Sequence, residues 1–158
     1  MRQTIVVLGG LLLAAGSPLY GQSGEIGRLH SMINQHREAV GCQALVWHEG
    51  AAVVAQRRSV DMDRRDYFDH TDPDGRTFID ELAAAGIQAW GTIAENIALT
   101  QAGAGSTLEL WVESPPHRRN LDFCAFTHQA IGLSSGYWTQ ILLAQPRTPG
   151  RGARRDPP

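Results

Sequence analysis

Residues 111–120 read Trp-Val-Glu-Ser-Pro-Pro-His-Arg-Arg-Asn, and this stretch decides how the surrounding chain is interpreted. Just before it, Ser106 and Glu109 have the three-residue spacing of a helix-capping box. This pattern predicts a helix that carries Trp111 and ends before Pro115, because proline has no N–H group to donate within a helix. The polar residues beyond the helix are the first candidates for a functional site.

Two other short polar segments lie upstream. Residues 94–98 read Ala-Glu-Asn-Ile-Ala. Residues 67–70 read Tyr-Phe-Asp-His, and the turn-forming Pro-Asp-Gly follows at 73–75. Each segment is a weak signal alone, but the ordered set is specific.

In this order, the motifs resemble those of the bacterial branch of the CAP superfamily, which comprises cysteine-rich secretory, antigen 5 and pathogenesis-related 1 proteins. The similarity covers roughly Leu29 to Ala144. The motifs that carry it are Phe68-Asp-His70, Pro73-Asp-Gly75, Glu95-Asn-Ile-Ala98 and Trp111 to Asn120, with flanking agreement at Ile33-Asn34, Arg37, Leu45-Val-Trp47, Ser59-Val-Asp-Met62 and Tyr137-Trp-Thr-Gln140.

The resemblance implies an α+β fold over residues 25–145, a three-layer α-β-α sandwich with a small antiparallel central sheet. The hydrophobic pattern is consistent with this fold class. Helical periodicity predicts helices over 25–40 and 49–66, and Thr77 with Asp80 predicts the capped start of a third helix. The two β-rich runs at 130–134 and 137–144 predict a hairpin.

The family's cleft positions fall on His70, Glu95 and His117, and several relatives bind a divalent metal there. Two imidazoles and a carboxylate are ligands that zinc accepts, so a zinc site is predicted on these three residues. The fourth family position, a glutamate in many eukaryotic members, is Ser114 here. The open alternative is structural: His70 bonds a buried carbonyl, Glu95 accepts amides in a tight turn, and Asn96 supports the loop.

The chain contains two cysteines, Cys42 and Cys124. An even cysteine count in an exported chain favours a disulfide, so we expect them to pair. Two free thiols or a thiolate nucleophile are the alternatives.

The N-terminus predicts export. Met1 and Arg2 precede an apolar run from Thr4 to Ala15, as in a secretory signal peptide, which we place at residues 1–21 and expect to be cleaved. The run is shorter than a membrane span, so no transmembrane anchor is expected and the protein is predicted to be secreted or held in the cell envelope. Residues 146–158 read as a disordered basic tail.

Net charge argues against nucleic-acid partners. The formal charge is −2 and the isoelectric point is near 6.3, whereas phosphate binding needs a positive field. The sequence gives no indication of the oligomeric state.

Three classes of function fit these residues. The first is a binding protein that holds a lipid, a small hydrophobic molecule or a peptide at the cleft. The second is a hydrolase, in which metal-bound water or the Ser114 hydroxyl attacks, His117 acts as base, and Glu95 orients it; His70 is a further catalytic candidate. The third is an extracellular interaction module. The sequence leaves open whether the protein is an enzyme.

Overall fold

Nine elements follow one another along the part of the chain that the computed structural model describes, residues 18–146. The predicted signal peptide lies outside this range up to residue 17, and the predicted tail lies outside it from residue 147. The helices are α1 (Pro18–Ala39), α2 (Glu49–Arg65), α3 (Phe78–Ala84), α4 (Gly103–Glu113) and α5 (Pro115–Leu121), and the strands are β1 (Val46–Trp47), β2 (Thr92–Leu99), β3 (His128–Ser134) and β4 (Tyr137–Ala144).

The sheet is built around the predicted hairpin of β3 and β4. Ser135 and Gly136 connect the two strands with positive φ angles of 45° and 88°, as a tight two-residue hairpin turn requires. The strand order is β1-β3-β4-β2. Every pairing is antiparallel except that of the two-residue β1 with β3, so the predicted α+β fold is confirmed, with a sheet that is mixed at one edge.

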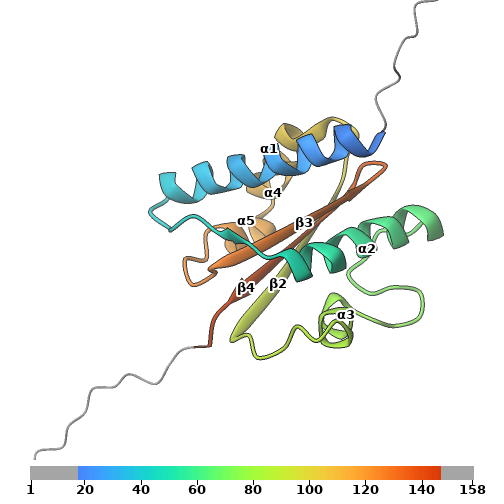
Figure 1. The fold of residues 1–158 in the computed structure, drawn as a ribbon. Helices are drawn as coiled ribbons and strands as arrows, with labels where there is room; N and C mark the ends of the chain where they lie inside the picture. Colours follow the sequence, from blue (N-terminus) through green and yellow to red (C-terminus); the bar gives the residue numbers. More distant parts are fainter. Residues whose placement is uncertain (1–17, 147–158) are drawn as a thin grey trace, which may run out of the picture.

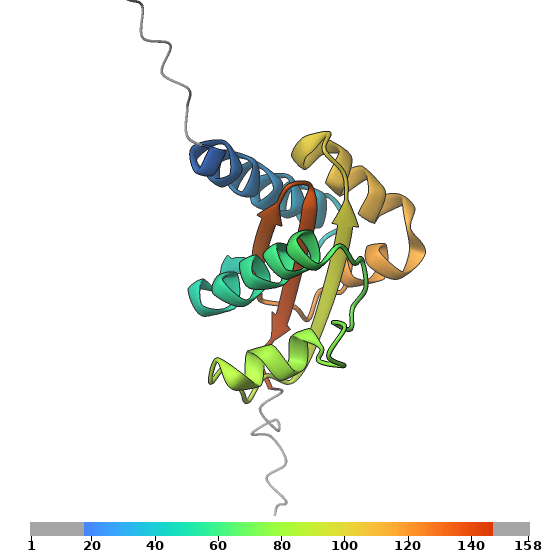
Figure 2. The same cartoon turned by 90° about the vertical axis from the view of Figure 1, so that its right-hand side faces the viewer.

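Helices cover both faces of this sheet. Helices α1, α4 and α5 lie on one face, and α2 and α3 lie on the other (Figure 1), and a quarter turn shows α2 crossing in front of the strands (Figure 2). This is the predicted three-layer arrangement. None of the helices in the described range is long and apolar enough to cross a membrane.

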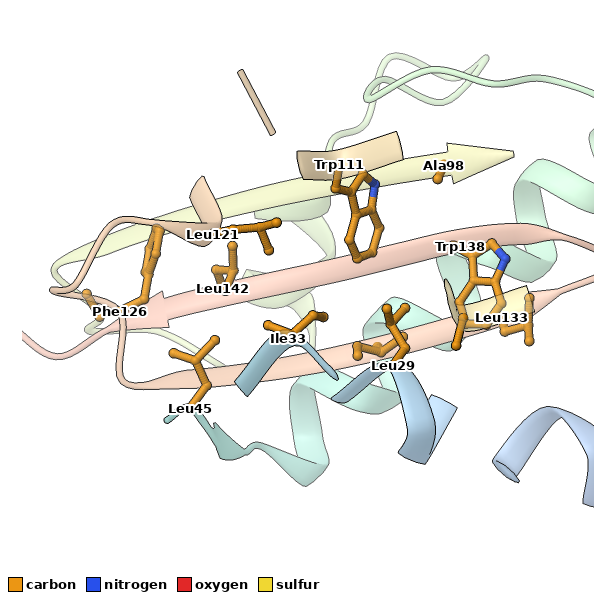
Figure 3. Packing of buried hydrophobic residues seen from close by; sticks show 13 residues of the cluster. Leu29, Ile33, Leu45, Ala98, Trp111, Leu121, Phe126, Leu133, Trp138 and Leu142 are labelled. Atoms are coloured by element: carbon orange, nitrogen blue, oxygen red, sulfur yellow. The ribbon is translucent and has the colours of Figure 1, made fainter. Parts of the chain in front are cut away.

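Two apolar clusters separate the layers. Figure 3 shows the first, in which Trp111 of α4 and Ile33 of α1 pack against the strand that carries Trp138 and Leu142. Both indoles are buried and donate to backbone carbonyls, Trp111 to Ile97 at 3.0 Å and Trp138 to Thr100 at 3.2 Å. The second cluster lies under α2 and α3, around Ala55, Leu82, Ile141 and Leu143.

The segment around Glu95 is a strand and not a turn. Residues 94–98 lie in the middle of β2, where successive side chains point to opposite faces of the sheet. Glu95 therefore faces α2 and α3, while Asn96 faces α4 and α5. The alternative in which Glu95 accepts amides in a tight turn is wrong.

Of the two predicted capping boxes, the one at the start of α3 is confirmed and the one at Ser106 is wrong. At α3, the Thr77 amide and hydroxyl both donate to Asp80 Oδ2 at 2.8 Å, which confirms the capping box. Helix α4 begins at Gly103, so Ser106 lies inside it. The reason is a tertiary contact, because Glu25 of α1 accepts a 2.7 Å hydrogen bond from the Ala104 amide and supplies the acceptor expected from Ser106.

The predicted disulfide is confirmed. Cys42 and Cys124 are bonded, with 4.8 Å between their α-carbons. Next to it, the buried guanidinium of Arg37 donates to the carbonyl oxygens of Leu121 and Phe126, at 2.6 and 3.2 Å. Together these contacts fasten the end of α1 to the segment that follows α5.

We predict that Gly132→Ala destabilises the protein strongly. A β-carbon at Gly132 would overlap the backbone carbonyl of Ala55, because α2 rests directly on β3 there. Neither backbone can yield without moving the layer, so the free energy of unfolding in urea should fall by at least about 2 kcal/mol.

The matched control is Gly105→Ala in α4. No atom lies within 4 Å of a β-carbon built at Gly105, and alanine favours a helix over glycine by about 0.5–1 kcal/mol. This variant should match or exceed the wild type in stability. Equal destabilisation by the two substitutions would contradict the close packing of α2 on β3.

Candidate functional site

The three residues predicted to line a cleft lie at the edge of the sheet formed by β2. This strand pairs with β4 on one side only, so its outer edge is accessible to loops from both helical layers. The loop after α2 brings His70 to the face that carries Glu95. Helix α5 brings His117 to the other face, where the Asn96 amide donates to the His117 carbonyl at 3.4 Å.

Glu95 is fixed through both carboxylate oxygens. Oε1 accepts from Arg58 Nε at 2.5 Å, and Oε2 bonds to His70 Nδ1 at 2.7 Å. The Arg58 side chain is fully buried and that of Glu95 is 1% exposed. The geometry of this buried ion pair is fixed because neither charged group can turn towards water. The carboxylate therefore orients the His70 ring and leaves its Nε2 atom to face outward.

Arg58 also organises the surrounding chain. Its Nη2 donates to the His70 carbonyl at 2.9 Å, and its Nη1 lies 3.4 Å from Glu81 Oε1. The other Glu81 oxygen is buried without a hydrogen-bond partner among the described residues, and burial raises the pKa of that carboxyl. Two carboxylates thus face one guanidinium, and only Glu95 is fully bonded.

The sequence motifs do not mark Arg58. The signal was present, because the positions that α2 buries against the sheet include Ala55, Arg58, Ser59 and Met62, at helical spacing. An arginine inside such a stripe must find a buried carboxylate or carbonyl partner. The sequence did not indicate which one.

The two cleft histidines have opposite electrostatic environments. The hydrogen bond to Glu95 raises the pKa of His70 above the usual 6.5, more than partial burial lowers it. Burial lowers the pKa of His117 below 6.5, and the nearby charge of His70 lowers it further. As the pH falls, His70 therefore takes up its proton before His117 does.

A row of hydrogen-bonded side-chain amides crosses the sheet from β2, and all but the half-buried Asn120 are buried. Asn120 donates to Asn96 at 2.8 Å, and Asn96 donates to Gln140 at 2.9 Å. Gln140 then donates to Gln129 at 2.8 Å, and Gln129 lies 3.0 Å from His30 Nδ1. The row links β2, β4 and β3 to α1, which bears out a structural role for Asn96 and adds residues that the motifs did not mark.

Ser114 and His117 do not form a nucleophile–base pair. Ser114 is the N-cap residue of α5, and Pro115 and Pro116 occupy the first positions of that helix. Among the described residues, the Ser114 hydroxyl makes no hydrogen bond with the His117 ring. A serine hydrolase needs that contact to activate its hydroxyl.

The predicted metal ligands are not grouped around a common point in the described chain. Glu95 bonds Arg58 through one carboxylate oxygen and His70 through the other. Within residues 18–146, no three histidine, cysteine or acidic side chains are grouped in a way that could hold a metal ion. Zinc binding at His70, Glu95 and His117 stays a prediction, and the function proposed for this site does not depend on it.

The other histidines have packing and hydrogen-bonding roles. His36 lies 2.7 Å from Asp122, and His48 caps α2 by accepting from the Ala51 amide at 3.0 Å. His128 packs edge-on against Trp90, with ring centroids 5.1 Å apart. Each of these three histidines therefore has a partner within the described chain.

Comparison with known proteins identifies one family. The model of the cysteine-rich secretory protein family, CAP, matches residues 30–142. An uncharacterized Bacillus subtilis protein, YkwD, is 32% identical over 116 residues, which cover 72% of this chain and 45% of that protein.

Solved structures show the same fold. An extracellular Bacillus anthracis protein containing an SCP domain superimposes with a TM-score of 0.75 at 27% identity, covering 78% of this chain and 41% of that one. A cysteine-rich secretory protein from Staphylococcus aureus gives 0.71 at 17% identity, with coverages of 81% and 40%. This chain spans less than half the length of each of these three relatives.

We predict that Arg58→Met lowers the free energy of unfolding by about 3–5 kcal/mol, because the buried Glu95 carboxylate loses its arginine and keeps only the bond to His70. The matched control is Arg65→Met on the same helix. The Arg65 side chain is 33% exposed and pairs with Asp61 and Asp74 near the surface, so its loss should lower the free energy of unfolding much less. Urea denaturation at pH 7 measures the free energy of unfolding of both variants. Similar losses would show that the Arg58–Glu95 pair stabilises the fold no more than a surface ion pair does.

Proposed function

Because the chain belongs to the CAP family of cysteine-rich secretory proteins, we propose that it is an exported binding protein whose cleft at His70, Glu95 and His117 holds a small amphiphilic ligand. An extracytoplasmic location is supported by the Cys42–Cys124 disulfide and by the extracellular relative that shares the fold. The predicted signal peptide would provide the route.

The observation that carries this proposal is the fixed His70 ring. Glu95 holds Nδ1 at 2.7 Å, and Arg58 holds the His70 backbone, while the side chain remains 52% exposed. A ring held in this way presents one polar atom, Nε2, in a constant direction. Such an atom is suited to anchoring the polar end of a ligand.

An apolar surface lies beside this anchor. Phe68, two residues before His70, is 47% exposed and packs against Tyr137 with ring centroids 6.5 Å apart. Leu99 pairs with Tyr137 across β2 and β4 and is also 47% exposed. Leu99 and Glu95 lie on the same face of β2, so a ligand anchored at His70 can place its apolar part on this surface.

Acid–base hydrolysis is the second candidate. The two cleft histidines have pKa values displaced in opposite directions, an arrangement that assigns an acid and a base in many enzymes. His117 would be the base and His70 the acid. The missing contact between Ser114 and His117 weighs against this candidate. It would require that the protein hydrolyse an ester such as p-nitrophenyl acetate and that His117→Ala abolish this activity.

We predict that octanoate binds the cleft more tightly at pH 6 than at pH 8. The raised pKa means that His70 carries its proton at pH 6 and loses it as the pH rises, so the charge-assisted hydrogen bond to the carboxylate weakens. The expected loss in affinity is about tenfold, equivalent to about 1.4 kcal/mol. Calorimetry on the full chain measures it.

The matched probe is 1-octanol, which has the same chain without the carboxylate and should show no such pH dependence. His70→Ala should remove the dependence for octanoate. If octanoate binds equally well to wild type and His70→Ala at pH 6, the anchor assigned to His70 is wrong.

A further inference from the structure

A groove of about 630 Å³ lies at the edge of the sheet opposite the cleft, between α1 and α2. Each helix contributes four residues at positions i, i+3, i+4 and i+7, which is one helical face. Trp47 of β1 and Ile131 of β3 complete the lining, which is mostly apolar. The helical residues are Ser23, Ile26, Gly27 and His30 from α1, and Glu49, Ala52, Val53 and Gln56 from α2.

The wall contributed by β3 contains an unpaired piece of sheet edge. Alternate residues of β3 direct their N–H and C=O groups away from β4. Of these, Gln129 pairs with the β1 side, where the His48 amide donates to its carbonyl at 2.9 Å. β1 ends at Trp47, so the next outward-facing residue, Ile131, has no strand beside it and no outward backbone hydrogen bond within the described chain.

At the next outward-facing position of β3, a side chain supplies the missing hydrogen bonds. At Leu133, the next outward-facing residue, the Gln56 side-chain amide accepts from the backbone N–H at 3.0 Å and donates to the carbonyl at 2.8 Å. A side chain thus takes the place of a neighbouring strand. Ile131 lies between this substitute and the end of β1, and it is only 2% exposed, so its free groups lie at the bottom of the groove.

Buried backbone N–H and C=O groups in proteins nearly always have hydrogen-bond partners. A ligand that offers such partners to Ile131 is therefore favoured. We propose that the groove binds an extended apolar peptide whose main chain pairs with Ile131 and extends the sheet beyond β1. Of the described residues that line the groove, only Glu49 is acidic. The peptide therefore carries a basic group that faces Glu49, with apolar side chains against Ile26 and Val53.

Two other possible occupants fit the groove less well. A lipid chain would fill the apolar walls but has no amide for Ile131. The segment 147–158 of this chain has basic residues but no hydrophobic side chain larger than Ala153, so it lacks groups to fill the walls.

The test is a titration of isotope-labelled full-length protein with the capped tetrapeptide acetyl-Val-Val-Lys-Val-amide, followed by NMR. The comparison probe is the same peptide with all four of its backbone amide nitrogens methylated, which keeps the apolar side chains and removes the main-chain donors. We expect saturable shifts at the Ile131 amide and at least tenfold weaker binding of the methylated peptide, the weight of one or two hydrogen bonds. Glu49→Gln should weaken the lysine peptide about two- to fivefold.

The blocking variant is Gly27→Trp, and its matched control is Gly24→Trp. Both glycines lie in α1 with nothing within 4 Å of an added β-carbon, but only Gly27 lines the groove. Gly27→Trp should abolish peptide binding, and Gly24→Trp should retain it. The proposal is overturned if the methylated peptide binds as tightly as the unmethylated one, or if the two tryptophan variants bind the peptide equally. It is also overturned if millimolar peptide shifts no amide signal at Ile131. None of these outcomes involves His70, so the cleft proposal stands or fails separately.

Discussion

The buried ion pair between Arg58 and Glu95 is the constraint on which the placement of His70 depends. Charges taken out of water need partners at every polar atom, and Glu95 finds them only if α2 and β2 hold their relative positions. Gly132 permits this by letting the backbone of α2 rest on β3. Arg58 then holds the His70 carbonyl, so one guanidinium fixes the carboxylate, the loop and the imidazole together.

The two edges of the sheet have different chemistry. At the β2 edge, polar side chains from both helical layers meet around Glu95 and Asn96. At the opposite edge, the short β1 leaves β3 uncovered beyond Trp47, and apolar helical faces form the walls of the groove. The row of amides from Asn120 to Gln129 connects these edges through the core, so a shift of one edge disturbs hydrogen bonds that reach the other.

The ordered motifs predicted the family, and the resemblance they carry implied the three layers. The two β-rich runs predicted the hairpin, and an even cysteine count in an exported chain predicted the disulfide. Ser106 was assigned wrongly because its role passed to Glu25, a residue 81 positions away in the chain. The motifs marked His70 and Glu95 but not Arg58 or Gln140, because residue type alone does not show which polar side chains become buried partners.

The most direct test of the fixed imidazole is the tautomer of neutral His70, read from its ring nitrogen chemical shifts by NMR at a pH above its pKa. The hydrogen bond to Glu95 predicts that the proton stays on Nδ1 and that Nε2 is unprotonated and faces the cleft. A proton on Nε2 would place a ring lone pair against the carboxylate. That result would contradict the orientation of His70 by Glu95 and, with it, the proposed anchor for a ligand.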